Sequence, residues 1–151
     1  MYRLKNYRKF ARLIKIEHHM ANFYTKITII GATFALLAVA LGAFGAHALK
    51  EPLIQHGSLD VWKTAVDYQM WHALALLLIA SKPTTFKHAA LTTWAFSVGI
   101  LLFSGSLYWL SLDGPRWLGP ITPLGGLSFM LGWTSLIVGQ CMKKTTGLDK
   151  D

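Results

Sequence analysis

This sequence has only one cysteine, Cys141, among its 151 residues. A lone cysteine cannot form an intrachain disulfide, and it excludes a CxxC redox or metal motif. The chain also lacks GxSxG and HExxH, the patterns that accompany a nucleophilic serine or a catalytic zinc. We therefore expect a protein that is not an enzyme, with no catalytic residue, no metal site and no resident cofactor.

Charged residues are scarce as well: they make up 15% of the chain, whereas a soluble domain has about 25%. Hydrophobic residues make up 53%, the mean hydropathy is +0.39, and the apolar residues are concentrated in blocks. This composition predicts a membrane protein. Acidic residues number seven against 15 Lys and Arg. The basic residues gather at the two ends and beside the apolar blocks without a nucleic-acid-binding motif, so we expect no nucleic-acid partner.

Four apolar blocks are long enough to cross a bilayer, whose hydrocarbon core needs about 20 residues of helix. They cover residues 27–49, 61–80, 89–112 and 123–141. The second block is the weakest candidate for a membrane span because Lys63 and Asp67 interrupt it. Prolines and glycines lie between the blocks and separate them. We expect an all-α integral membrane protein with four transmembrane helices and short loops.

The basic residues also predict the orientation of these helices, because Lys and Arg concentrate in cytoplasmic segments. Only Lys50, Lys63 and Arg116 fall on one side, and the other twelve fall in residues 1–26, in the link after the second block and in the C-terminal tail. Both termini are predicted to be cytoplasmic, with the protein in the bacterial inner membrane.

The chain divides into a basic cytoplasmic segment (1–26), a transmembrane domain (27–141) and a cytoplasmic tail (142–151). In the first segment, apolar residues recur at helical spacing between basic ones. This pattern is typical of an interfacial helix on anionic lipid, and the alternative is a frayed tail whose charges only enforce orientation. Met20 is an alternative start of translation.

Small residues recur at alternating steps of three and four in the first and fourth blocks. In lipid, such stripes allow close contact between helix backbones, so we expect the first and fourth helices to pack tightly, against each other or against their neighbours. The stripes consist of Gly31, Ala35, Ala38, Gly42 and Gly45, and of Gly125, Ser128, Gly132, Ser135 and Gly139.

Polar residues inside the blocks are candidates for function, since a charge near a helix centre costs about 2.5–3.5 kcal/mol on insertion scales. His47 is expected near the outer interface. Asp67 follows Lys63 by four residues, a spacing that predicts a surface ion pair.

His72 shares an apolar helix face with Tyr68, one turn before it, and should point into the bundle. A buried histidine hydrogen-bonded to such a neighbour has a structural role. Two alternatives remain: His47 and His72 approach each other near the outer leaflet and bind haem or a metal, or they line a binding site with Tyr68 and Gln69.

Four segments, one in each block, carry a family resemblance: "GAFGAHAL" (42–49), "YQMWHALALLL" (68–78), "FSGSLYWLSL" (103–112) and "PLGGLSFMLGW" (123–133). They resemble the YgdD/YwdK-like family of small, uncharacterised four-helix bacterial inner-membrane proteins with eukaryotic relatives. The resemblance implies a fold and a location, and places the family's motif glycines and histidines at Gly42, Gly45, His47 and His72. It implies no activity.

Three functions remain in order of preference. The first is a non-enzymatic structural, assembly or envelope-homeostasis component of the membrane, in contact with lipids. The second is a module that binds or transports a small molecule, ion or lipid as a homo-oligomer. The third is an intramembrane haem or metal protein that uses His47 and His72.

Overall fold

The computed structural model describes residues 2–81 and 86–148, and every regular element in these ranges is helical. Helix α1 (Tyr2–Ala46) is followed by the short α2 (Lys50–Gln55) and by α3 (Leu59–Ser81). Pro52 lies inside α2 and does not end a helix. It is tolerated there because the first N–H groups of a helix have no helical partner to lose.

The second half of the chain contains two long helical rods. In the first, α4 (Phe86–Gly99), the π-helical turn η1 (Ile100–Ser104) and α5 (Gly105–Ser111) follow without a break. The 3-10 turn η2 (Arg116–Leu118) then leads into α6 (Ile121–Leu148). Each of the four predicted blocks thus lies largely within one rod. The π-helical turn was not predicted, and residues 149–151 of the predicted tail lie outside the described residues.

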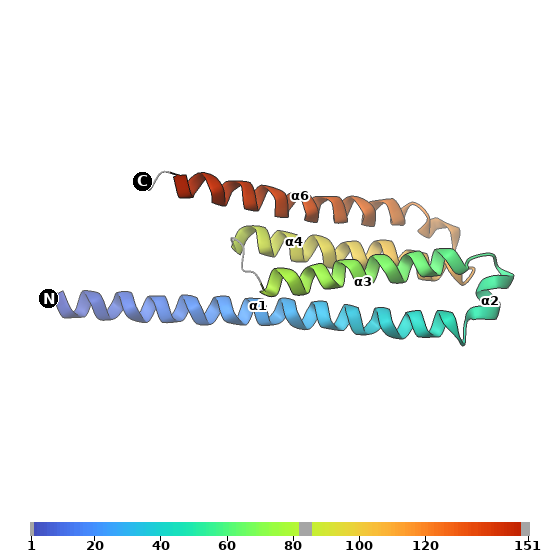
Figure 1. The fold of residues 1–151 in the computed structure, drawn as a ribbon, viewed down its shortest axis with the longest axis horizontal. Helices are drawn as coiled ribbons and strands as arrows, with labels where there is room; N and C mark the ends of the chain where they lie inside the picture. Colours follow the sequence, from blue (N-terminus) through green and yellow to red (C-terminus); the bar gives the residue numbers. More distant parts are fainter. Residues whose placement is uncertain (1, 82–85, 149–151) are drawn as a thin grey trace.

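The rods lie side by side in an antiparallel bundle (Figure 1). Helix α1 packs against α3, α3 packs against η1 and α5, and α4 with η1 packs against α6. The two ends of the chain lie at the same end of the bundle, and α2 lies at the opposite end (Figure 1). Residues 2–26 continue straight into the rest of α1, and the first part of this segment extends past the ends of α3 and α4 (Figure 1), whereas Phe23 and Tyr24 pack against the core. The interfacial placement of the segment stays a prediction.

Within the described residues, three helical segments are long and apolar enough to cross a membrane: Leu13–Ala46, His88–Ser111 and Arg116–Cys141. They contain most of three of the four predicted blocks. Helix α3 is as long as a span, with 23 residues, but Asp67, Gln69 and His72 lower its hydropathy.

A small apolar core joins all four rods. Its largest fully buried side chains include Phe96 of α4, Leu76 of α3 and Ile27 of α1, and Phe129 of α6 packs against them. Large apolar side chains also cover the outside of the bundle, among them Leu36, which is 69% exposed. In water such a surface would be a liability, whereas in lipid it is the expected one.

The small-residue stripe of α1 faces α3. A Cβ atom added to Gly31 would lie 3.1 Å from the carbonyl oxygen of Ala73, and one added to Gly45 would overlap the indole of Trp62. Ala38 is fully buried, Gly42 lies against Val66, and Ala35 is half-buried on the same face. These contacts bring the two backbones close together, which is what small residues permit in lipid.

The small-residue stripe of α6 faces α4 and η1 instead. All five of its members are buried: Gly125, Ser128, Gly132, Ser135 and Gly139. The residues opposite its three glycines are Phe103, Phe96 and His88. An added Cβ atom would overlap the backbone of Phe103 at Gly125 and the side chains of Phe96 and His88 at Gly132 and Gly139. The hydroxyl of Ser128 donates to the Ala95 carbonyl at 2.7 Å. The first and fourth helices were expected to pack either against each other or against their neighbours. Each stripe packs against a neighbouring rod: that of α1 against α3, and that of α6 against α4 and η1.

Candidate functional site

The four predicted site residues do not share one place. Gln69 and His72 are buried in the bundle, each 4% exposed, and Tyr68 is half-buried beside them. His47 is exposed in the turn between α1 and α2. The buried polar residues therefore lie at the centre of the bundle, and His47 lies at its end.

The ring of His72 is fully engaged by neighbouring groups. Its Nδ1 lies 2.8 Å from the backbone carbonyl of Tyr68, and its Nε2 lies 3.2 Å from the indole Nε1 of Trp133 on α6. A carbonyl only accepts and an indole N–H only donates, so these partners specify a neutral ring protonated at Nδ1. The ring also stacks on Phe129, with centroids 3.5 Å apart. Neither nitrogen is available to a metal.

Tyr68 bonds to His72 through its backbone carbonyl, and the ring of His72 also lies beside the phenol ring of Tyr68, with centroids 6.1 Å apart. The phenol ring stacks on Phe103 with centroids 4.6 Å apart. The sequence predicted the pairing of the two residues but not the atoms that make it.

Gln69 joins three helices. Its amide N–H donates to the carbonyl of Phe34 on α1 at 2.9 Å, and its amide oxygen accepts from the hydroxyl of Tyr108 on α5 at 3.1 Å. Two turns earlier on α3, the indole of Trp62 donates to the carbonyl of Leu41 at 3.0 Å. Such bonds satisfy polar groups that would otherwise be buried at a cost.

Sequence reasoning missed Trp62, Tyr108 and Trp133 as members of this group. Trp62 precedes Gln69 by seven residues, a spacing that puts both on one helix face. That spacing was a usable signal. Trp133 and Tyr108 gave none, because their partners are distant in the sequence.

The hypothesis that His47 and His72 approach each other is wrong. Moving seven residues forward on α3, from Trp62 to Gln69, moves the contact seven residues back on α1, from Leu41 to Phe34. His72 therefore lies level with Gly31, whose neighbour is Ala73. At 1.5 Å per residue, His47 is about 24 Å away along α1. Among the described residues, no group of three or more His, Cys, Asp or Glu is placed to hold a metal.

The ion pair expected between Lys63 and Asp67 is also replaced by another. The ammonium of Lys63 lies 3.3 Å from the carboxylate of Asp60, one turn toward the helix start, and Asp67 is left exposed. Both spacings, three and four residues, bring side chains together on a helix, so the sequence did not distinguish between them.

The geometry of this cluster suits helix bracing better than ligand binding. Trp62, Gln69, His72, Tyr108 and Trp133 each direct a polar atom to a group on another helix. The acceptors include two backbone carbonyls of α1, so the polar cluster holds α1, α3, α5 and α6 together.

A double-mutant cycle between Gln69→Leu and Tyr108→Phe should show a coupling energy of about 1 kcal/mol, the size measured for hydrogen bonds between membrane helices. Tyr108→Phe removes one bond of Gln69 and leaves its bond to Phe34 intact. Unfolding of purified protein in micelles, titrated with a denaturing detergent, gives the four free energies.

The control for this cycle pairs Gln69→Leu with Thr134→Val. Thr134 is exposed on α6 and bonds only within its own helix, to the Met130 carbonyl. The two control changes should be additive. Additivity of Gln69→Leu and Tyr108→Phe as well would show that their bond contributes nothing to stability.

Comparison with known proteins identifies relatives of this chain. A family model described as a protein of unknown function (DUF423) matches residues 41–126. The UPF0382 membrane protein YwdK of Bacillus subtilis is 48% identical over 113 residues, covering 73% of this chain and 91% of the relative. A UPF0382 membrane protein of Staphylococcus aureus is 47% identical over 111 residues, covering 73% and 90%.

A third relative, from Staphylococcus saprophyticus, is 46% identical over 112 residues, covering 74% of this chain and 92% of its own. No solved structure matches the chain. These relatives are named as membrane proteins, in keeping with the apolar helices of the bundle. The protein belongs to the DUF423 family and is a relative of the UPF0382 membrane proteins, among them YwdK.

Proposed function

We propose that this protein is a four-span protein of the bacterial inner membrane with a structural or assembly role. The observation that carries the proposal is the engagement of its buried polar side chains. His72 uses both ring nitrogens, and Gln69 uses its amide N–H and its oxygen, in contacts with the protein itself. Polar groups that are hydrogen-bonded within the protein stabilise the bundle and have few donors or acceptors left to bind a substrate.

The placement of α3 supports four spans. Its 23 residues rise about 34 Å, enough for a hydrocarbon core of about 30 Å. Two of its polar residues, Gln69 and His72, face the interior, so its low hydropathy does not measure what lipid would meet. An even number of spans also agrees with two chain ends at one end of the bundle (Figure 1).

The binding-module alternative loses support in its original form. A site lined by His47, His72, Tyr68 and Gln69 would need His47 beside the other three, and it lies at the end of the bundle. The haem or metal alternative needs the same pair of histidines. Lipid remains the proposed partner of the outer surface, where large apolar side chains are exposed.

Reporter fusions test the topology. A reporter active only in the periplasm should be inactive when fused after Lys144 and active when inserted after Gly57, in the turn between α2 and α3. A reporter fluorescent only in the cytoplasm should give the opposite pattern. Periplasmic activity after Lys144 would overturn the model with both termini inside, and equal signals at both sites would remove α3 as a span.

A further inference from the structure

One face of α3 points away from the bundle along most of the helix. Its residues recur at steps of three and four, and all are exposed: Thr64, Asp67, Trp71, Leu74, Leu78 and Ser81, with the exposed Lys63 beside them. This period of 3.5 residues is the one by which two long helices keep contact along a shared seam. The opposite face of α3, with Ala65 and Leu76, is buried in the bundle.

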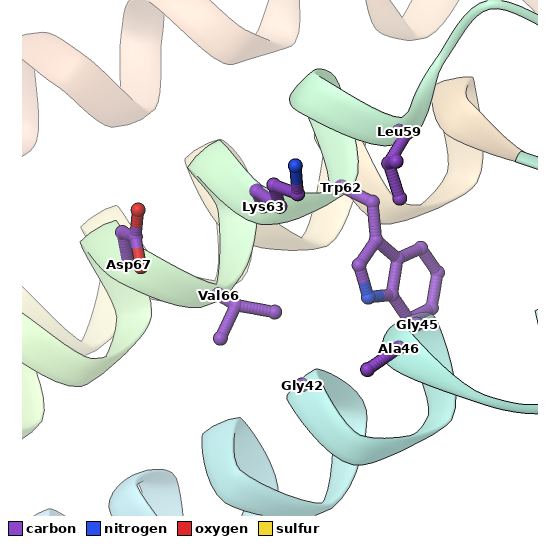
Figure 2. A pocket seen from close by; sticks show the side chains of 8 residues that line it. All are labelled: Gly42, Gly45, Ala46, Leu59, Trp62, Lys63, Val66 and Asp67. Carbon is purple, nitrogen blue, oxygen red and sulfur yellow. The ribbon is translucent and has the colours of Figure 1, made fainter. Parts of the chain in front are cut away.

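A shallow notch lies beside the first part of this seam (Figure 2). Its volume is about 200 Å³. Trp62 and Val66 point from α3 toward Gly45 and Gly42 of α1, while Lys63 and Asp67 follow one another along α3 at the rim (Figure 2). The notch therefore lies directly beside the two charged residues of this face.

Asp67 is the charged group that this surface leaves without a counter-ion. It is exposed, no ion pair joins it to another described side chain, and Lys63 instead binds Asp60. An exposed carboxylate inside the first turns of a span is costly, since lipid tails provide no cation. A partner that brings a basic group to this depth would relieve the cost.

We infer that the outer face of α3 is the interface between two copies of this protein, related by a two-fold axis along the bilayer normal. The seam is self-complementary in charge: the ammonium of Lys63 in one copy and the carboxylate of Asp67 in the other meet twice. A symmetric interface of this kind repeats each contact. Trp71 and Leu74 continue the contact toward the middle of the bilayer.

A second copy fits this surface better than a lipid does. Lys63 and Asp67 carry opposite charges one helical turn apart, so two parallel copies at the same depth automatically place a cation within reach of each anion. In such a parallel pair, each apolar residue of the seam lies opposite the same apolar residue of the other copy. The inference rests on the bilayer placement of α3 proposed above, and the reporter fusions test that placement independently of any association.

Cysteine cross-linking in native membranes tests the interface. In a Cys141→Ser background, Leu74→Cys and Leu78→Cys, both at exposed positions of the seam, should each form a disulfide-linked dimer under mild oxidation. Leu101→Cys, which is 63% exposed on the π-helical turn of another rod, is the control and should stay monomeric. Equal cross-linking at Leu101 and at the seam would indicate random collision and overturn the interface.

Charge reversal tests the ion pairs. In the Leu74→Cys background, Lys63→Asp and Asp67→Lys should each lower the cross-linked fraction about tenfold, which corresponds to about 1.4 kcal/mol. The double variant, Lys63→Asp with Asp67→Lys, restores complementarity and should recover most of the dimer. Glu51→Gln, which changes an exposed acid on α2 and not on the seam, should have no effect. Failure of the double variant to recover, while both singles remain folded, would overturn the charge pairing, and a monomer at every lipid-to-protein ratio would overturn the dimer.

Discussion

Gly132→Leu should remove most of the folded protein from the membrane. Gly132 is buried where α6 crosses α4, and a Cβ atom there would lie 2.5 Å from Cδ1 of Phe96. Phe96 is fully buried and cannot swing outward. The hydroxyl of Thr92 also lies 3.4 Å from the carbonyl of Gly132, so the two backbones are already close.

The expected cost of Gly132→Leu is about 3 kcal/mol, at the upper end of the range for overpacked cores. Membrane abundance and the unfolding free energy in micelles both measure it. Gly126→Leu is the matched control: it lies on the same helix, and its nearest neighbour, Cδ2 of Phe103, would be 3.9 Å from an added Cβ. If both leucines reduced abundance equally, close packing at Gly132 would not be the cause.

The helical fold follows from the sequence because apolar length and proline position are local properties. The four predicted blocks lie within the observed rods apart from the last residues of 27–49 and 89–112, which form turns after Ala46 and Ser111. The proposed span α3 is less apolar on average than the other three, because hydropathy averages a helix over all its faces, whereas Gln69 and His72 occupy only the inner face.

The partners of the polar side chains depend on which helices are neighbours, which a single sequence does not specify. His72 was correctly expected inside the bundle, but its bond to Trp133 spans 61 residues. His47 and His72 were expected on adjacent antiparallel helices. His72 does lie on α3, which packs against α1, and His47 lies in the turn directly after α1. The error was one of register, since His72 pairs with the middle of α1 and His47 follows its end.

The two small-residue stripes illustrate a further limit. Their alternating steps of three and four predict a close-packed face, and both faces lie against another helix. The spacing does not specify which helix that is, because this depends on the order of the helices in the bundle. Trp62 fills the space beside Gly45, and Phe96 fills the space beside Gly132, so each glycine is matched to one aromatic ring on a different helix.

His72→Lys should prevent most molecules from folding in a bilayer, while His72→Met should leave them largely folded. Both side chains are long and flexible, so the comparison isolates the charge. At this position, 4% exposed and against Phe129, an ammonium would cost about 2.5–3.5 kcal/mol, a decrease of roughly 100-fold in the folded-to-unfolded ratio.

The measurement for this pair is the protease-resistant fraction of each variant reconstituted in vesicles. Methionine cannot replace the hydrogen bonds of His72 to Tyr68 and Trp133. The His72→Met variant should therefore lose about 1 kcal/mol of stability, the size of bonds of this kind. The further loss in His72→Lys measures the effect of the charge. Equal folding of the two variants would mean that the lysine reaches water. In that case α3 would not cross the hydrocarbon core at His72, and the four-span arrangement would fail with it.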